Sequence, residues 1–287
     1  MSEALTALDG DYAHCETIVR RDDPDRWLAS LFLPEGKRRY AHALYAFSLE
    51  IARAREVVSE PMLGEIRFQW WREALEQPDR EDVRANPVAA AVTDVLARFD
   101  LPRENLLQLI DARQFDLFDD PMQTVDELEA YAKATSSNLY CLTPMILEPD
   151  TPSAGFGASG HGGTAYALTG LLRAFPWHAA RGQCYVPLDI LRRHGLERAD
   201  IVSGRSTPAL LSALEEVRAL ARSHLEIFLS RIEGLPDLAR PAFLPISLCE
   251  PYLRLMEGKC YDPFKTNIVL PQWRRQWALW RAAKHWG

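Results

Sequence analysis

Two segments of the sequence, residues 45–56 and 170–189, hold the side chains best suited to chemistry. These side chains are Tyr45, Arg53, Glu56, Arg173, His178 and Tyr185. A carboxylate and a histidine could transfer protons, whereas guanidinium groups among tyrosines could hold an anion. Glu56 and His178 are therefore the candidates for catalysis. For His178 a second interpretation stays open, in which Glu56 or a backbone carbonyl simply satisfies the ring.

A metal could be sought in the acidic run DARQFDLFDD, residues 111–120. Asp116 and Asp120 share a helical face at i, i+4. However, Pro121 ends the helix there, and a solvated acidic helix end explains the run without a metal. The acids of RRDDPDR, residues 20–26, are similarly typical of a turn and a helix cap.

Helices must position these side chains, because apolar residues recur at helical spacing almost throughout, as at Leu44, Phe47 and Ile51. There is no persuasive strand alternation. Proline and glycine breaks divide the chain into roughly ten helices with connections of ordinary length. The sequence predicts an all-α fold and one domain over residues 1–287.

The bulk composition excludes several classes of protein. The net charge is −7, and an acidic body argues against nucleic acid as a partner. Five cysteines without a C-x-x-C pair predict neither a disulfide framework nor a zinc site. The start of the chain lacks the apolar region of a secretory signal, and no run approaches the ~18 apolar residues of a membrane span. We therefore expect a cytoplasmic protein that could bind peripherally to the inner membrane.

The segment LPEGKRRYAHALYAF, residues 33–47, resembles the start of the first metal-binding helix of squalene and phytoene synthases, with Arg38 and Tyr45 at matching positions. Tyr131 matches a tyrosine that lines the family's cavity. The family's R-G-x-x-Y-L-P-x-D pattern is similar to Arg173, Gly182, Tyr185, Pro187 and Asp189. The resemblance implies a helical bundle of the isoprenoid synthase type around a central cavity. Members of the family use magnesium ions to hold two isoprenoid diphosphates.

The aspartates that hold magnesium in this family are nearly all replaced. In the first helix their positions become Ala52, Arg53 and Glu56. In the second, the family's N-x-x-R-D-x-x-E-D pattern aligns with Gly170, Arg173, Ala174, Trp177 and His178. One carboxylate flanked by arginines cannot collect magnesium, which needs several oxygen ligands. We expect very weak or absent prenyl transfer and no cofactor.

A narrower resemblance is to one branch of this superfamily, complex I assembly factor 6 and its bacterial relatives. It rests on L-R-A-x-P-aromatic-H at residues 172–178, P-L-D-I-L-x-x-H-G-L at 187–196, and P-A-F-L at 241–244. The resemblance covers nearly the whole chain. It implies a synthase fold that assists the assembly of the respiratory NADH:ubiquinone oxidoreductase.

Residues 271–287 form an aromatic and basic C-terminal helix. Trp273, Trp277 and Trp280 recur at i, i+4, i+7, and arginines and a lysine are interleaved along the segment. This pattern is typical of an interfacial helix, so the expected membrane or partner contacts are Trp273, Arg274, Arg275, Trp277 and Trp280. A final helix that packs its tryptophans on the core is an equal alternative.

Our leading hypothesis is a non-catalytic protein of the synthase fold that acts by binding in complex I assembly. Its partner would be a complex I subunit or an assembly intermediate, and its cavity could hold an isoprenoid diphosphate or an anionic lipid. The predicted cavity residues are Arg38, Tyr45, Arg53, Glu56, Tyr131, Arg173, His178 and Tyr185. One alternative is a divergent magnesium-dependent prenyltransferase acting on farnesyl or geranylgeranyl diphosphate. Another is a pure interaction protein with a collapsed cavity.

Overall fold

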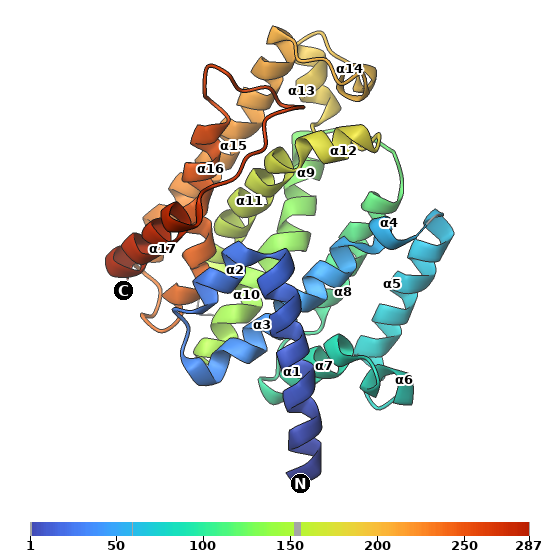
Figure 1. Ribbon diagram of the computed structural model, residues 1–287, viewed down its shortest axis with the longest axis vertical. Coiled ribbons are helices and arrows are strands. Elements are labelled where there is room, and N and C mark those ends of the chain that lie inside the picture. Colours follow the sequence, from blue (N-terminus) through green and yellow to red (C-terminus); the bar gives the residue numbers. More distant parts are fainter. Residues whose placement is uncertain (1, 59, 152–155, 287) are drawn as a thin grey trace.

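The computed structural model describes residues 2–58, 60–151 and 156–286, and every regular element within these ranges is a helix (Figure 1). The first half contains α1 (Ser2–Asp22), α2 (Pro24–Ser30), α3 (Glu35–Ala52), α4 (Ala54–Val57), α5 (Pro61–Glu76), α6 (Glu81–Arg84), α7 (Pro87–Arg98), α8 (Glu104–Arg113), α9 (Val125–Ala132) and α10 (Asn138–Leu147). The second half contains α11 (Phe156–Arg173), α12 (Phe175–Ala180), α13 (Leu188–Arg193), α14 (Arg198–Val202), α15 (Pro208–Ile232), α16 (Cys249–Leu255) and α17 (Gln272–Trp286). Gln114–Leu117 and Arg240–Leu248 are 3₁₀ helices, and Lys133–Ser137 is a π-helix. The all-α prediction is confirmed.

The helices are more numerous than the sequence predicts, partly because two of them break. α3 ends before Arg53, whose backbone has φ −87° and ψ −1°, and α4 follows directly. α11 ends before Ala174, at φ −84° and ψ 0°, and α12 follows. Both breaks fall where the family resemblance puts an aspartate. Glu56 and His178 therefore lie on the short helices α4 and α12 rather than on the long ones.

Two apolar clusters form the core. One joins mainly α1, α3, α5, α7, α8 and α10, and the other joins α11 to α17. Trp27 and Trp286 pack against both clusters. Met122, Tyr131 and Tyr185 form a third, small cluster. Burial of these side chains is the main stabilising contribution. The single domain over 1–287 stays a prediction.

The π-helix packs closely against α11 because of a glycine. A Cβ atom on Gly163 would lie 2.4 Å from the Cα of Ser137, closer than real Cβ contacts. Glycine at this position therefore lets the two backbones meet. The π-helix, an uncommon element that often occurs at functional sites, brings Thr135 and Ser136 to the central cavity.

Candidate functional site

A central cavity of about 230 Å³ lies among α2, α3, α8, α9, the π-helix, α11 and α12. Its polar lining includes Arg26, Ser48, Arg113, Tyr131, Ser136 and His178. An apolar compartment of about 20 Å³ adjoins it and shares Leu171 and His178. Of the predicted cavity residues, Tyr131 and His178 line the cavity and Tyr185 lines the compartment.

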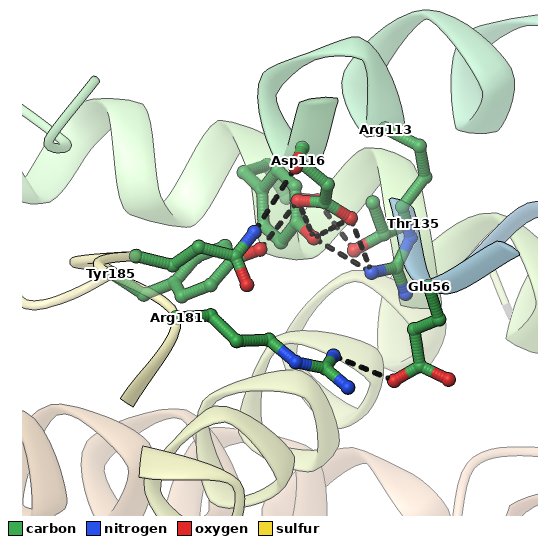
Figure 2. Close-up of polar contacts among 8 residues, drawn as sticks. Glu56, Arg113, Asp116, Thr135, Arg181 and Tyr185 are labelled. Atoms are coloured by element: carbon green, nitrogen blue, oxygen red, sulfur yellow. Dashed lines mark hydrogen bonds and ion pairs between the residues drawn. The ribbon is translucent and has the colours of Figure 1, made fainter. Parts of the chain in front are cut away.

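Glu56 joins the two segments that the sequence singled out. Its carboxylate accepts a hydrogen bond of 2.8 Å from Arg181, just beyond α12 (Figure 2). Both side chains are about half exposed, at 45% and 47%. Such an exposed ion pair contributes little to stability, about 0–1 kcal/mol. The pair nevertheless engages the one carboxylate that survives from the first metal motif.

The arginines predicted to give the cavity its positive charge are engaged elsewhere. Arg53 donates to Asp22 at 2.7 Å. Arg173 lies 3.2 Å from Asp25 and stacks on Tyr252, with its guanidinium carbon 3.6 Å from the ring centroid. These two side chains are neutralised by carboxylates of α1 and α2. Neither side chain lines the cavity, so the prediction that these two arginines form an anion-binding lining is wrong.

Two other predicted cavity residues lie outside the lining. Arg38 donates to the carbonyl oxygens of Leu31 and Leu33, so it holds the turn before α3. Tyr45 is buried, and its ring faces the guanidinium of Arg26 at 5.1 Å. Tyr45 therefore positions a cavity arginine, whereas Arg38 has a purely structural contact.

Asp116 lies behind the lining of the cavity and contacts three lining residues, an arrangement that the sequence did not predict. Its carboxylate accepts hydrogen bonds from Tyr185 at 2.6 Å, Tyr131 at 2.8 Å and Arg113 at 2.9 Å (Figure 2). The residue is 5% exposed, so the expectation of a solvated acidic run is wrong for it. Burial raises the pKa of Tyr131 and of Tyr185 well above the ordinary value. Both phenols therefore keep their protons and donate hydrogen bonds to the carboxylate.

His178 contacts neither of the partners expected for it. Its ring centroid lies 4.5 Å from that of Tyr185, and its buried Nδ1 has no hydrogen-bond partner within the described ranges. Glu56 instead contacts Arg181. The interpretation of a histidine held by Glu56 is therefore wrong, and the ring stands beside the cavity without a group that would orient it as a base.

The burial of His178 predicts a dependence of stability on pH. Burial lowers its pKa from 6.5 to about 4. The contribution of the neutral ring is thus complete above pH 6.5 and is lost as the pH falls towards 4. We expect the free energy of unfolding to fall by about 2–3 kcal/mol from this group over that range, measured by urea denaturation. His178→Phe, which cannot titrate, should lose less, and equal losses in both proteins would contradict the assignment.

The side chains present do not suit magnesium ions. Magnesium needs several oxygen ligands in near-octahedral geometry. Among residues 2–58, 60–151 and 156–286, no group of three or more His, Cys, Asp or Glu side chains could hold a metal ion. The carboxylates of Glu56 and Asp116 are paired with Arg181 and Arg113. A chemistry that depends on bound magnesium therefore has no support in these residues.

The C-terminal helix α17 exposes three of its tryptophans, whereas Trp286 packs against the core. Trp273, Trp277 and Trp280 are 64%, 58% and 42% exposed, which excludes the alternative that they pack on the core. Figure 1 places α17 at the side of the bundle, next to α15 and α16. Arg275 was expected on this surface, but it points inward and lies 3.1 Å from Asp25. In the part of the chain that the structure describes, no helix is both long and apolar enough to span a membrane.

The fold and cavity define a helical bundle of the isoprenoid synthase type. The family model for squalene/phytoene synthase matches residues 19–281, and the chain belongs to this family. Among solved structures, a dehydrosqualene synthase in complex with a ligand has a TM-score of 0.82 at 18% identity, with 97% of each chain covered. A squalene synthase from Alicyclobacillus acidocaldarius has a TM-score of 0.72 at 21% identity, with 87% of this chain and 94% of that one covered.

Sequence relatives point to the narrower branch. The chain is 31% identical to NADH dehydrogenase (ubiquinone) complex I, assembly factor 6, of Rattus norvegicus, across 94% of this chain and 84% of the relative. It is 30% identical to the Homo sapiens protein of the same name, across 90% and 79%. The 15-cis-phytoene synthase of Synechococcus elongatus is 25% identical, across 97% and 94%.

Proposed function

We propose that this chain is a non-catalytic member of the squalene/phytoene synthase family that acts by binding in the assembly of respiratory complex I. The observation that carries the proposal is that residues at the former metal site form ion pairs within the protein, Arg53 with Asp22 and Glu56 with Arg181. Arg53 supplies no oxygen ligand, and the carboxylate of Glu56 is already paired with Arg181, whereas magnesium needs several free oxygen ligands. The cavity of about 230 Å³ is also smaller than the roughly 300–1,000 Å³ of ordinary ligand sites.

The role in assembly is supported by the printed names of the relatives, which are complex I assembly factors. The partner would be a complex I subunit or an assembly intermediate, met in the cytoplasm at the inner membrane. Deleting the gene in the native host should lower the NADH:ubiquinone oxidoreductase activity of its membranes. Restoration by the wild-type gene is the control, and unchanged activity in the deletion strain would refute the role.

The absence of catalysis is tested directly. Purified protein incubated with farnesyl or geranylgeranyl diphosphate and magnesium should release no pyrophosphate above the rate without enzyme, because the residues that the structure describes contain no carboxylate cluster to bind the metal that activates the leaving group. A phytoene synthase assayed in parallel is the positive control. Robust release would favour the alternative of a divergent prenyltransferase, which the similarity to a phytoene synthase supports.

We further propose that the outward face of α17 contacts the membrane surface. Trp277 and Trp280 stack with centroids 5.1 Å apart, and Lys284 lies 4.2 Å from the ring centroid of Trp280. Aromatic rings with adjacent cations suit the interface of an anionic bilayer.

Replacing all three exposed tryptophans of α17 by alanine should weaken co-sedimentation with phosphatidylglycerol vesicles by at least roughly tenfold, because their apolar area no longer enters the interface. The matched control is Met62→Ala with Ile66→Ala on α5, which removes side chains of similar exposure, 67% and 61%. Unchanged binding of the tryptophan variant, or equal losses in both, would contradict the membrane contact.

A further inference from the structure

A groove of about 720 Å³ lies between α17 and the helices α15 and α16, and it shares no lining residue with the central cavity. Its deepest lining residues are apolar and buried, with Ile246 at 0% and Leu270 at 2% exposure. Leu225 and Leu229 of α15 and Leu255 of α16 form the wall opposite α17. The volume falls within the roughly 300–1,000 Å³ of ordinary small-ligand sites. The groove can therefore accept an apolar group of that size.

The edge of the groove that α17 provides is basic. Four lining residues share this edge at the helical spacing i, i+4, i+7 and i+11, namely Arg274, Ala278, Arg281 and His285. The one carboxylate in the described lining, Glu250, is paired with Arg222 and Arg254. In the ranges that the structure covers, no carboxylate pairs with Arg274 or Arg281. The groove therefore combines an apolar interior with two guanidinium groups that are available to an anion.

The groove is continuous with the exposed face of α17. Trp273 and Trp277 line the groove and are also two of the exposed tryptophans of that face. A lipid that meets these rings at the membrane surface thus lies beside the opening of the groove. One of its chains can enter without crossing a layer of water, which keeps its apolar surface buried throughout.

Two other occupants fit the groove less well. Its walls are helices, whose backbone N–H and C=O groups are paired within each helix, so an extended peptide gains no main-chain hydrogen bonds there. A second copy of this chain that inserted its own α17 would bring like charges against Arg274 and Arg281. An anionic headgroup that carries an apolar chain satisfies both the basic edge and the apolar interior.

We propose that the groove between α17 and the helices α15 and α16 binds one acyl chain of an anionic phospholipid. The headgroup phosphate accepts hydrogen bonds from Arg274 and Arg281, and the chain lies against Leu229, Leu255 and Ile246. The inference rests on the proposed membrane contact of α17, since it names the lipid class and the site that holds one lipid molecule. The central cavity takes no part, because it shares no residue with this groove.

The test is isothermal titration of the full chain with lauroyl lysophosphatidylglycerol, lauroyl lysophosphatidylcholine and glycerol phosphate, with both lysolipids below their critical micelle concentrations. Lysophosphatidylglycerol should bind at one site. Lysophosphatidylcholine should bind at least about tenfold more weakly, because its choline cation opposes the arginines, and glycerol phosphate should not bind measurably. Equal binding of the two lysolipids, or of glycerol phosphate, overturns the proposal. No binding of any probe also overturns it and leaves a protein segment as the occupant of the groove.

Charge variants test the basic edge. Arg274→Gln combined with Arg281→Gln should weaken the binding of lysophosphatidylglycerol by at least about tenfold, since both guanidinium contacts with the phosphate are lost. The matched control combines Lys259→Gln with Lys284→Gln, which removes the same charge from exposed residues outside the groove lining. The control should bind as the wild-type protein does. Equal losses in the two double variants would show that only the overall charge matters, and the site would be wrong.

Two exposed leucines test the position of the chain. Leu229 lines the groove and is 44% exposed, whereas Leu238 is 58% exposed and lies outside the lining. Leu229→Ser should weaken the binding of both lysolipids by about fivefold, because the chain loses an apolar contact, and Leu238→Ser should leave binding unchanged. Wild-type affinity in Leu229→Ser would overturn the placement of the chain in this groove.

The groove and the membrane contact fail separately. A protein that sediments with phosphatidylglycerol vesicles but does not bind lysophosphatidylglycerol overturns the groove site alone. A protein that binds the lysolipid but does not sediment with vesicles overturns the proposed membrane contact of α17.

Discussion

Replacing Asp25 by asparagine is expected to lower the free energy of unfolding by about 3 kcal/mol. The carboxylate is 5% exposed and accepts from Tyr252 at 2.7 Å while it pairs with Arg173 and Arg275. Removing its charge leaves two guanidinium groups without their counter-ion. We place the loss at the low end of the range for a broken buried pair because Arg173 is 33% exposed and water screens it.

Urea denaturation of the wild-type protein and the variant at pH 7 measures this effect. The matched control is Asp119→Asn, which breaks the pair with Arg55 on a carboxylate that is 53% exposed. The control should lose less than about 1 kcal/mol, as exposed pairs do. If Asp25→Asn lowers the free energy of unfolding no more than the control does, the ion pairs with Arg173 and Arg275 do not stabilise the folded state.

Asp25 also shows why the site could be predicted only in part. Its segment RRDDPDR was expected to form a turn and a helix cap, and Asp23 does cap α2 by accepting from the backbone N–H of Arg26. The same segment supplies the partners of Arg53 and Arg173. Arg53 lies 31 residues from its partner in the sequence, and Arg173 lies 148 residues from its own. Nothing in local spacing indicates which carboxylate a distant arginine will meet.

The helical fold was predictable because it depends on periodicity and on motifs that survive when the acids are lost. The local backbone geometry of the acidic run at residues 111–120 was not predictable. The i, i+4 pairing of Asp116 with Asp120 assumed a regular α-helix, whereas Gln114–Leu117 forms a 3₁₀ helix that ends before Asp119. Asp116 is therefore buried beneath the cavity, and Asp119 instead pairs with Arg55 at the surface. The sequence does contain a signal for this cluster. Arg113 and Asp116 are spaced at i, i+3, and Tyr131 and Tyr185 match tyrosine positions of the family.

We expect Asp116→Asn to be the most destabilising of the substitutions considered, with a loss of about 3–5 kcal/mol. The carboxylate serves three donors, Arg113, Tyr131 and Tyr185, and its side chain is 8% exposed. An amide cannot accept as strongly from all three, and its own N–H₂ must face donors. The guanidinium of Arg113 then lacks a counter-ion in a buried position.

The matched control for Asp116→Asn is Asp111→Asn. This variant breaks the ion pair between Arg72 and a carboxylate that is 62% exposed. It should cost less than about 1 kcal/mol. Tyr131→Phe and Tyr185→Phe should each cost about 1–2 kcal/mol, and the double variant should not reach the cost of Asp116→Asn, because it leaves the ion pair intact. If it does reach that cost, the hydrogen bonds of the two phenols rather than the charge pair supply the stability of this cluster.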